Sequence, residues 1–167
     1  GLIQAGRTRG MDDDSPYDIQ VSRSDRPTDT PSDMQILEAI ALTLVESDCP
    51  GAEISVALVD DASMAKMNER FLDHKGSTDV LSFDLSDSPE ERLEGELVVS
   101  VDTAERQARE RSHDLGAEVV LYCIHGTLHL LGHDDAERSE ADEMHRIEDK
   151  LLTELGWGPV YRGTKST

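Results

Sequence analysis

The chain has 167 residues, of which 16 are basic and 36 acidic, so its formal net charge is −20, and aromatic residues make up only 4% of it. This length suits one domain with a sizeable core. The charge argues against passive adhesion to nucleic acid or anionic lipid, because proteins that bind in this way usually carry a basic face.

The remaining composition fits a reducing cytoplasm. Two cysteines, Cys49 and Cys123, are too few for a disulfide scaffold, and their spacing matches no cysteine-only metal motif. No stretch approaches the roughly 20 apolar residues of a membrane span, and the first residues do not resemble a secretory signal.

A single domain between two loose ends is the expected organisation. Residues 1–16 are mostly polar and charged, which is typical of a disordered tail. Residues 1–10 precede the first methionine, Met11, and fit a cloning remnant or a start assigned too early. The domain is expected to span residues 17–156, and residues 157–167 to form a loose C-terminal tail.

Apolar and polar residues alternate with strand and helix periods along the domain. The pattern predicts, in chain order, a strand at 17–21, a helix at 33–46, a strand at 53–59, a helix at 61–71, strands at 79–83 and 95–101, and helices at 102–112, 115–131 and 139–155. Four strands mixed with four or five helices predict an α+β or α/β sheet covered by helices. Of these we expect the α+β fold, with a mixed sheet.

The segment 124–135 carries most of the functional information. His125 and His129 are four residues apart on the most apolar predicted helix, so both imidazoles project from one face and can hold one ion. Gly132 can adopt a left-handed conformation that ends the helix and turns the chain back. Zinc accepts nitrogen and carboxylate ligands, and a catalytic site keeps one position for water. We therefore expect one zinc ion at the end of this helix, rather than two satisfied core histidines.

Two residues after the turn are candidates for the third ligand. The pattern HxxxHxxGxx followed by a ligand favours Asp135, with His133 as the alternative because it directly follows the turn glycine. Asp134 could orient a ligand from the second shell or cap the next segment. Asp79 could likewise hydrogen-bond a ligand imidazole.

The same spacing is found in HExxHxxGxxH metalloproteases, whose general base is the glutamate after the first histidine. Gly126 occupies that position here, so the base is absent. The missing base argues against peptide hydrolysis, and a phosphodiester suits the remaining groups better.

At these residues the chain resembles the YbeY family of bacterial ribosomal RNA maturation factors, which are metal-dependent endoribonucleases. The family pattern H-G-x-L-H-L-x-G-[YH]-D-H matches residues 125–134, and Asp135 replaces its last histidine. Further matches are Asn68, Phe71, the strand 77–83, the strand 95–100, and Met144, Glu148 and Leu152 in the last helix. The similarity runs from about residue 17 to residue 156.

The resemblance implies an endoribonuclease in small-subunit ribosomal RNA processing and ribosome quality control. It implies cleavage of phosphodiester bonds with a zinc-activated water, with His125, His129 and Asp135 as catalytic and metal-binding residues. The implied partners are ribosomal RNA and the small ribosomal subunit or its proteins, in the cytoplasm.

Three departures from the family pattern concern catalytic power more than fold. Asp135 is an anionic ligand and would lower the Lewis acidity of the ion. Leu72 stands where many members have arginine, which removes one candidate phosphate contact, and Ser77 replaces the usual proline.

The net charge leaves RNA binding to a local basic patch or to a protein partner. Arg70, His74 and Lys75 form a candidate substrate contact, although a solvated loop explains them equally well. The arginines of the helix 102–112 alternate with glutamates and are read as an exposed, salt-bridged face. Two other functions stay open: a ribosome assembly factor with a mainly structural metal, and, less favoured, a zinc metalloprotease.

Overall fold

The computed structural model describes residues 15–23, 30–70, 80–88 and 90–160. Within them the elements are β1 (Tyr17–Arg23), α1 (Asp33–Glu46), β2 (Ala52–Val59), α2 (Asp61–Arg70), β3 (Val80–Asp84), β4 (Leu93–Ser100), α3 (Val101–Arg111), α4 (Leu115–Leu130) and α5 (Arg138–Glu154). This arrangement confirms the predicted α+β fold, and each element begins and ends within two residues of its predicted bounds.

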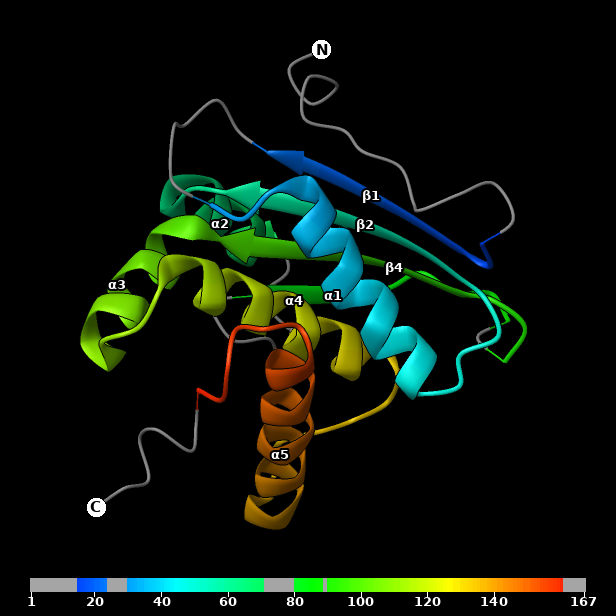
Figure 1. Ribbon diagram of the computed structural model, residues 1–167. Coiled ribbons are helices and arrows are strands. Elements are labelled where there is room, and N and C mark those ends of the chain that lie inside the picture. The colour runs from blue at the N-terminus through cyan, green and yellow to red at the C-terminus, as the bar shows by residue number, and fades with distance from the viewer. Residues whose placement is uncertain (1–14, 24–29, 71–79, 89, 161–167) are drawn as a thin grey trace.

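The strands form one mixed sheet in the order β1-β2-β4-β3. β1 and β4 both pair in parallel with β2, and β3 pairs antiparallel with β4. Alternate strand residues, such as Ile19, Ile54 and Leu97, are buried in the main core. Helices α1 and α4 cover this face (Figure 1). The intervening residues Leu81 and Val98 face the other side and pack with Met64 of α2.

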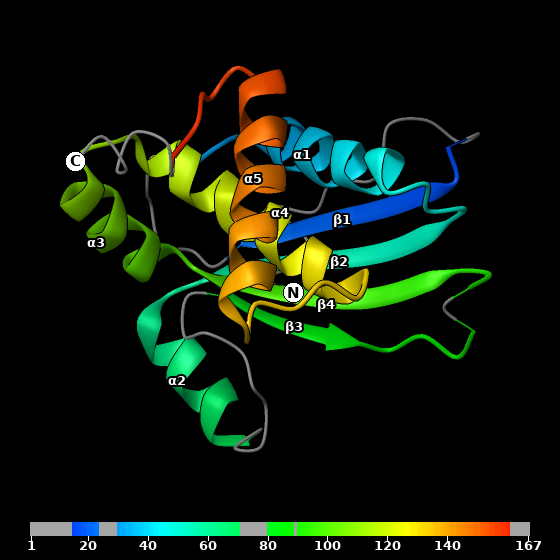
Figure 2. The same cartoon turned by 90° about the horizontal axis from the view of Figure 1, so that it is seen from below.

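Helix α4 is the central element of the helical layer, which explains its apolar sequence. Twelve of its residues are buried, and the helix contacts the sheet, α1, α3 and α5. Helix α5 crosses α4 (Figure 2), so the last helix of the chain lies against the segment that carries the two histidines.

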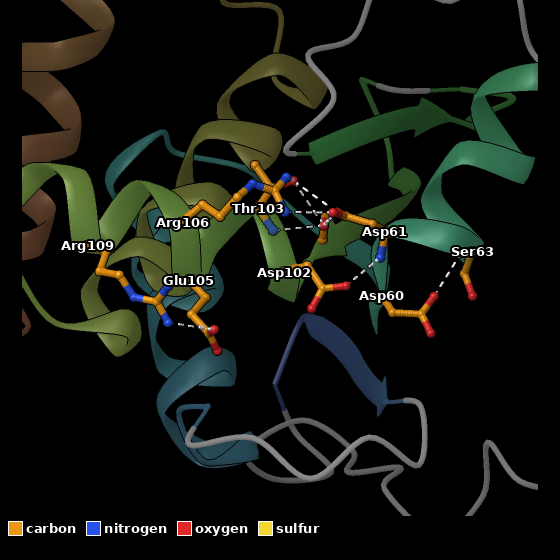
Figure 3. A network of polar contacts seen from close by, with 9 residues as sticks. Asp60, Asp61, Ser63, Asp102, Thr103, Glu105, Arg106 and Arg109 are labelled. Atoms are coloured by element: carbon orange, nitrogen blue, oxygen red, sulfur yellow. Dashed lines mark hydrogen bonds and ion pairs between the residues drawn. The ribbon is translucent and has the colours of Figure 1, made fainter.

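Strand β4 passes directly into α3 between residues 100 and 101, one residue before the predicted boundary. Ser100 ends the strand and caps the helix, because its hydroxyl oxygen accepts a hydrogen bond from the Thr103 amide at 3.1 Å. The Ser100 hydroxyl also donates to Asp61 at the start of α2, at 2.7 Å. Thr103 and Arg106 donate to the same carboxylate, and Figure 3 shows how this network joins α2 to α3.

Replacing Asp61 with asparagine removes its ion pair with Arg106 and is expected to lower the free energy of unfolding at neutral pH. The loss should not exceed about 1 kcal/mol, because both side chains of the pair are largely exposed. The hydrogen bonds from Arg106 and then Ser100 lower the pKa of the Asp61 carboxyl. Because the pKa of Asp61 is lower in the folded protein than the value of 3.8 in the unfolded chain, the ionised carboxylate stabilises the fold at pH values above 3.8. This contribution is lost as the pH falls through the pKa of the folded protein. Urea unfolding at several pH values should therefore give curves that differ at neutral pH and converge in acid.

A suitable control for the Asp61 variant is Glu105→Gln, since Glu105 pairs with Arg109 along the exposed face of α3. This variant should change stability by no more than a few tenths of a kcal/mol. A stability difference for Asp61→Asn that is independent of pH would contradict the account.

The arginines of α3 are only partly the exposed face that the sequence predicts. Arg109 does pair with Glu105, but Arg111 donates to Glu118 of α4 at 3.2 Å. Glu118 is fully buried and also contacts His113. A carboxylate in the core is thus held at the α3–α4 junction by an arginine and a histidine.

The chain remains packed beyond α5, although the sequence predicts a loose tail from residue 157. The Val160 amide donates to the buried Asp149 carboxylate at 2.8 Å, and Val160 itself is buried. Trp157 packs against the main core. A buried acceptor in α5 thus holds the chain at residue 160.

Among the described residues, no helix has the length and apolar character needed to cross a lipid bilayer.

Candidate metal centre

The C-terminal end of α4 turns back in a Schellman motif. The Gly132 amide donates to the His129 carbonyl at 3.0 Å, and the His133 amide donates to the Leu128 carbonyl at 3.0 Å. Gly132 has φ +103°, the left-handed conformation expected from the sequence. The turn directs the following residues back along the helix, toward the histidines of its last two turns.

His125, His129 and Asp135 come together at this turn. The two Nε2 atoms are 3.0 Å apart. Asp135 Oδ2 lies 3.5 Å from Nε2 of His125 and 3.8 Å from Nε2 of His129. Zinc lies about 2.0–2.2 Å from nitrogen and oxygen ligands, so ligand atoms around one ion are separated by about 3–3.5 Å. The three atoms are therefore spaced close to what a single ion requires.

Each ring nitrogen that faces away from this group has an acceptor. His129 Nδ1 lies 3.0 Å from the backbone carbonyl oxygen of His133. His125 Nδ1 lies 2.6 Å from Glu148 Oε2. A carbonyl oxygen can only accept, and a carboxylate ordinarily does so, hence both Nδ1 atoms carry the hydrogen in the neutral rings. The lone pairs are then on the Nε2 atoms.

Two lone pairs facing each other at 3.0 Å, with a carboxylate oxygen beside them, repel unless a positive charge lies between them. A divalent ion supplies that charge and satisfies all three groups together. The donor set of two imidazoles and one carboxylate is also one that zinc binds in catalytic sites. The residues present thus fit a divalent metal ion.

The group is shielded on the α5 side and open to solvent on the other. The side chain of His125 is 16% exposed, that of His129 30% and that of Asp135 42%. This exposure leaves room for a water molecule or a substrate oxygen beside the three ligands, as a catalytic site requires.

Gly126 follows the first histidine and faces the sheet. A Cβ atom at this position would lie 2.8 Å from Leu97 Cδ2 and 3.1 Å from Ser82 Oγ. The helix can approach the sheet this closely only because residue 126 has no side chain. The position that bears the general base of HExxH metalloproteases consequently has no space for a glutamate, in agreement with the sequence-based argument against peptide hydrolysis.

The Gly126→Ala variant is expected to lower the free energy of unfolding by about 1–3 kcal/mol, because α4 must move off the sheet. Urea denaturation of the single variant, of Leu97→Ala and of the double variant measures this effect. Truncation of Leu97 removes the nearest contact, so the alanine at 126 should cost less in the double variant. Strictly additive changes in stability would contradict the proposed contact.

Asp134 and His133, the other candidates in the turn, make different contacts from Asp135. The Asp134 carboxylate accepts the backbone amides of Asp135 and Ala136, so it orders the turn and not a ligand imidazole. The His133 carbonyl oxygen accepts from His129 Nδ1, and His133 also lines a hollow of about 350 Å³ with Glu46 and Lys150. This arrangement favours Asp135 over His133 as the third ligand.

Two of the candidate substrate contacts, His74 and Lys75, lie outside the described residues. So do Asp79, the candidate partner of a ligand imidazole, and Leu72, which stands where many family members have arginine. Arg70 is the last residue of α2, and its side chain is also outside the described part.

Glu148 is the residue at the site that sequence reasoning missed. Its carboxylate is completely buried and contacts His125, although the sequence analysis assigned it only to the last helix. A signal was present: Glu148 lies four residues from both Met144 and Leu152, within the buried stripe of α5. A charged residue in an apolar stripe is expected to have a hydrogen-bond or ion-pair partner. The sequence alone did not identify that partner as His125.

Cys123 lies in α4 two residues before His125 but has a structural role. Burial raises the pKa of its thiol to about 12, so the thiolate needed for nucleophilic attack or metal binding is absent at neutral pH.

The chain is similar over most of its length to known proteins. A family model described as Endoribonuclease YbeY matches residues 18–156. A protein named Endoribonuclease YbeY from Carboxydothermus hydrogenoformans is 40% identical over 121 residues, which cover 72% of this chain and 84% of that protein. One of the same name from Myxococcus xanthus is 41% identical over 117 residues, covering 68% of this chain and 40% of the relative. The solution structure of TM1509 from Thermotoga maritima has a TM-score of 0.52 at 22% identity, over 89% of this chain and 94% of that one, and so shares the fold.

Proposed function

Because the chain belongs to the endoribonuclease YbeY family, whose members are hydrolases that act on RNA, we propose that His125, His129 and Asp135 hold one zinc ion that serves cleavage of ribosomal RNA. The observation that carries this proposal is the convergence of two Nε2 atoms and one carboxylate oxygen within 4.8 Å of one another. We place the reaction in the cytoplasm, on small-subunit ribosomal RNA during maturation and quality control.

The three ligands leave the solvent-facing side of the site to the substrate. When bound, a divalent ion polarises a phosphoryl oxygen and lowers the pKa of a coordinated water toward neutrality. His125 and His129 are held in the tautomer that presents Nε2 to the site, so they need no proton rearrangement before binding. The exposed Asp135 closes the ligand set from the loop, and its anionic charge offsets part of the charge of the ion.

The net charge of −20 has a consequence for the substrate. Long-range attraction between this chain and free RNA is absent, so encounter is expected to depend on a basic partner. Proteins of the small ribosomal subunit would supply such a partner next to the RNA. We therefore propose that the ribosome-bound RNA is cleaved more efficiently than the same RNA free in solution.

Cleavage of a single-stranded ribosomal RNA fragment tests the proposed activity. Protein stripped with a chelator should be inactive, and one equivalent of zinc should restore cleavage. The same assay on small subunits should give a higher rate than on the free fragment. Cleavage by stripped protein at the rate of the zinc-loaded protein would contradict the proposal.

A second function, an assembly factor with a structural metal, is favoured by one observation: the net charge of −20 suits basic ribosomal proteins better than RNA. Co-sedimentation with small subunits distinguishes the two. An assembly factor binds subunits without cleaving RNA when zinc is present, whereas the proposed enzyme does both.

A further inference from the structure

We propose, on the basis of the proposed metal centre, that Glu148 is a positioning residue that directs Nε2 of His125 to the metal ion. Its carboxylate accepts the Nδ1 hydrogen of that imidazole and thereby fixes both the tautomer and the ring orientation. The positioning group belongs to α5, an element that contributes no ligand of its own.

The contact between Glu148 and His125 is short and enclosed. Glu148 Oε2 lies 2.6 Å from His125 Nδ1, and the glutamate is completely buried. The two residues are 23 positions apart in the chain, so the contact depends on α5 crossing α4. Hydrogen bonds from a ligand imidazole to a carboxylate fix ring orientation and raise the basicity of the ligand nitrogen.

Stability does not explain why a glutamate occupies this position. Within the described part of the chain, its other oxygen, Oε1, is buried and has no hydrogen-bond partner. Its neighbours along the stripe, Met144 and Leu152, belong to the apolar core. Burial of an incompletely paired carboxylate costs free energy, so an apolar residue would serve the fold better. Orientation of the ligand His125 by the carboxylate would explain why this free-energy cost is tolerated at Glu148.

The two ligand histidines are oriented by acceptors of different strength. The acceptor for His129 Nδ1 is a neutral backbone carbonyl at 3.0 Å, whereas that for His125 is an ionisable side chain at 2.6 Å. Hydrogen bonds to charged acceptors are shorter and stronger than those to neutral ones. His125 is therefore the more firmly held ligand, and this difference can be removed by substitution at Glu148 alone.

Glu118 offers a matched control within the same protein. Like Glu148 it is a completely buried glutamate that contacts a histidine, His113. It differs in also pairing with Arg111 and in lying at the opposite end of α4 from the metal centre. Loss of Glu118 should therefore affect stability without affecting metal binding.

The experiment measures zinc affinity by competition with a chromophoric chelator and the melting temperature of the zinc-free protein by circular dichroism. Glu148→Met should lower zinc affinity by about 10–100-fold. Its zinc-free melting temperature should equal or exceed that of the unsubstituted protein. Glu118→Met should lower the melting temperature and leave zinc affinity unchanged.

Two conservative variants separate orientation from charge. Glu148→Gln keeps an acceptor of the same reach, so zinc affinity should stay within a few-fold of the original value. Glu148→Asp keeps the charge but is too short to reach His125, and it should lose affinity about tenfold or more. The reverse order would overturn a positioning role, because it would mean that only the charge matters.

The outcome distinguishes failure of this inference from failure of the metal centre. Zinc binding that survives His125→Ala would refute the proposed metal centre itself. Zinc binding that requires His125 but is as tight in Glu148→Met and Glu148→Asp would overturn the role of Glu148 alone. If Glu148→Met does not fold, the zinc affinity of Glu148→Asp tests the role of Glu148 alone: an affinity equal to that of the unsubstituted protein would overturn it.

Discussion

The His125→Ala variant is expected to lose stoichiometric zinc and to cleave RNA more than about 100-fold more slowly than the unsubstituted protein. The estimate follows from ligand chemistry, because outer-shell changes alone cost about 10–100-fold in metal affinity or activity and loss of a ligand should cost more. His129→Ala should behave in the same way, since both Nε2 atoms face the same point. Metal content after dialysis and cleavage rates on a single-stranded RNA fragment measure the two effects.

His133→Ala is the matched control for these variants. It is also a histidine of the 125–133 segment, but it lines the hollow beside Glu46 and Lys150 and is not one of the three converging residues. Its backbone carbonyl, which accepts from His129, is retained in the variant. Zinc content and cleavage should therefore be preserved. Loss of zinc in His133→Ala with retention in His125→Ala would contradict the assignment of ligands.

The second large effect concerns Asp135, where this chain departs from the family pattern it resembles. Asp135→Asn should lower zinc affinity by at least about tenfold, because a neutral amide oxygen replaces an anionic ligand. Asp135→His should keep the ion bound, since an imidazole is an equally acceptable ligand. It should also cleave RNA faster, because a neutral third ligand leaves more positive charge on the ion to polarise the phosphoryl oxygen.

Measurement of zinc affinity and of single-turnover cleavage on the same two variants separates binding from chemistry. Asp135→Ala provides the reference for a missing side chain. If Asp135→Asn and Asp135→Ala bind zinc as tightly as the unsubstituted protein, the carboxylate is not a ligand.

The fold class and the convergence of His125, His129 and Asp135 could be predicted from the sequence because they depend on local periodicity. The alternation in 17–21 and 53–59 and the four-residue spacing of His125 and His129 are properties of single elements. The turn at Gly132 could also be anticipated, because a glycine after the last apolar residue commonly ends a helix. These features together predict that Asp135 lies close to the two histidines, as it does in the structure.

Contacts between distant elements were not accessible in this way. Glu148 meets His125 only because α5 crosses α4, and no pattern within either helix specifies that crossing. The buried pairing of Glu118 with Arg111 and His113 was missed for the same reason. Gly126 was noted as the absent base, whereas its contact with Leu97 depends on how α4 packs on the sheet.

X-ray absorption of the zinc-loaded protein tests the central claim, the identity of the ligand set, most directly. We predict one zinc ion with two imidazole ligands and the remaining positions filled by oxygen, at about 2.0–2.2 Å. A spectrum that requires three imidazoles would assign the third position to another histidine. A spectrum that requires sulfur, or a zinc ion with no imidazole at all, would place the metal away from His125 and His129 and contradict the account.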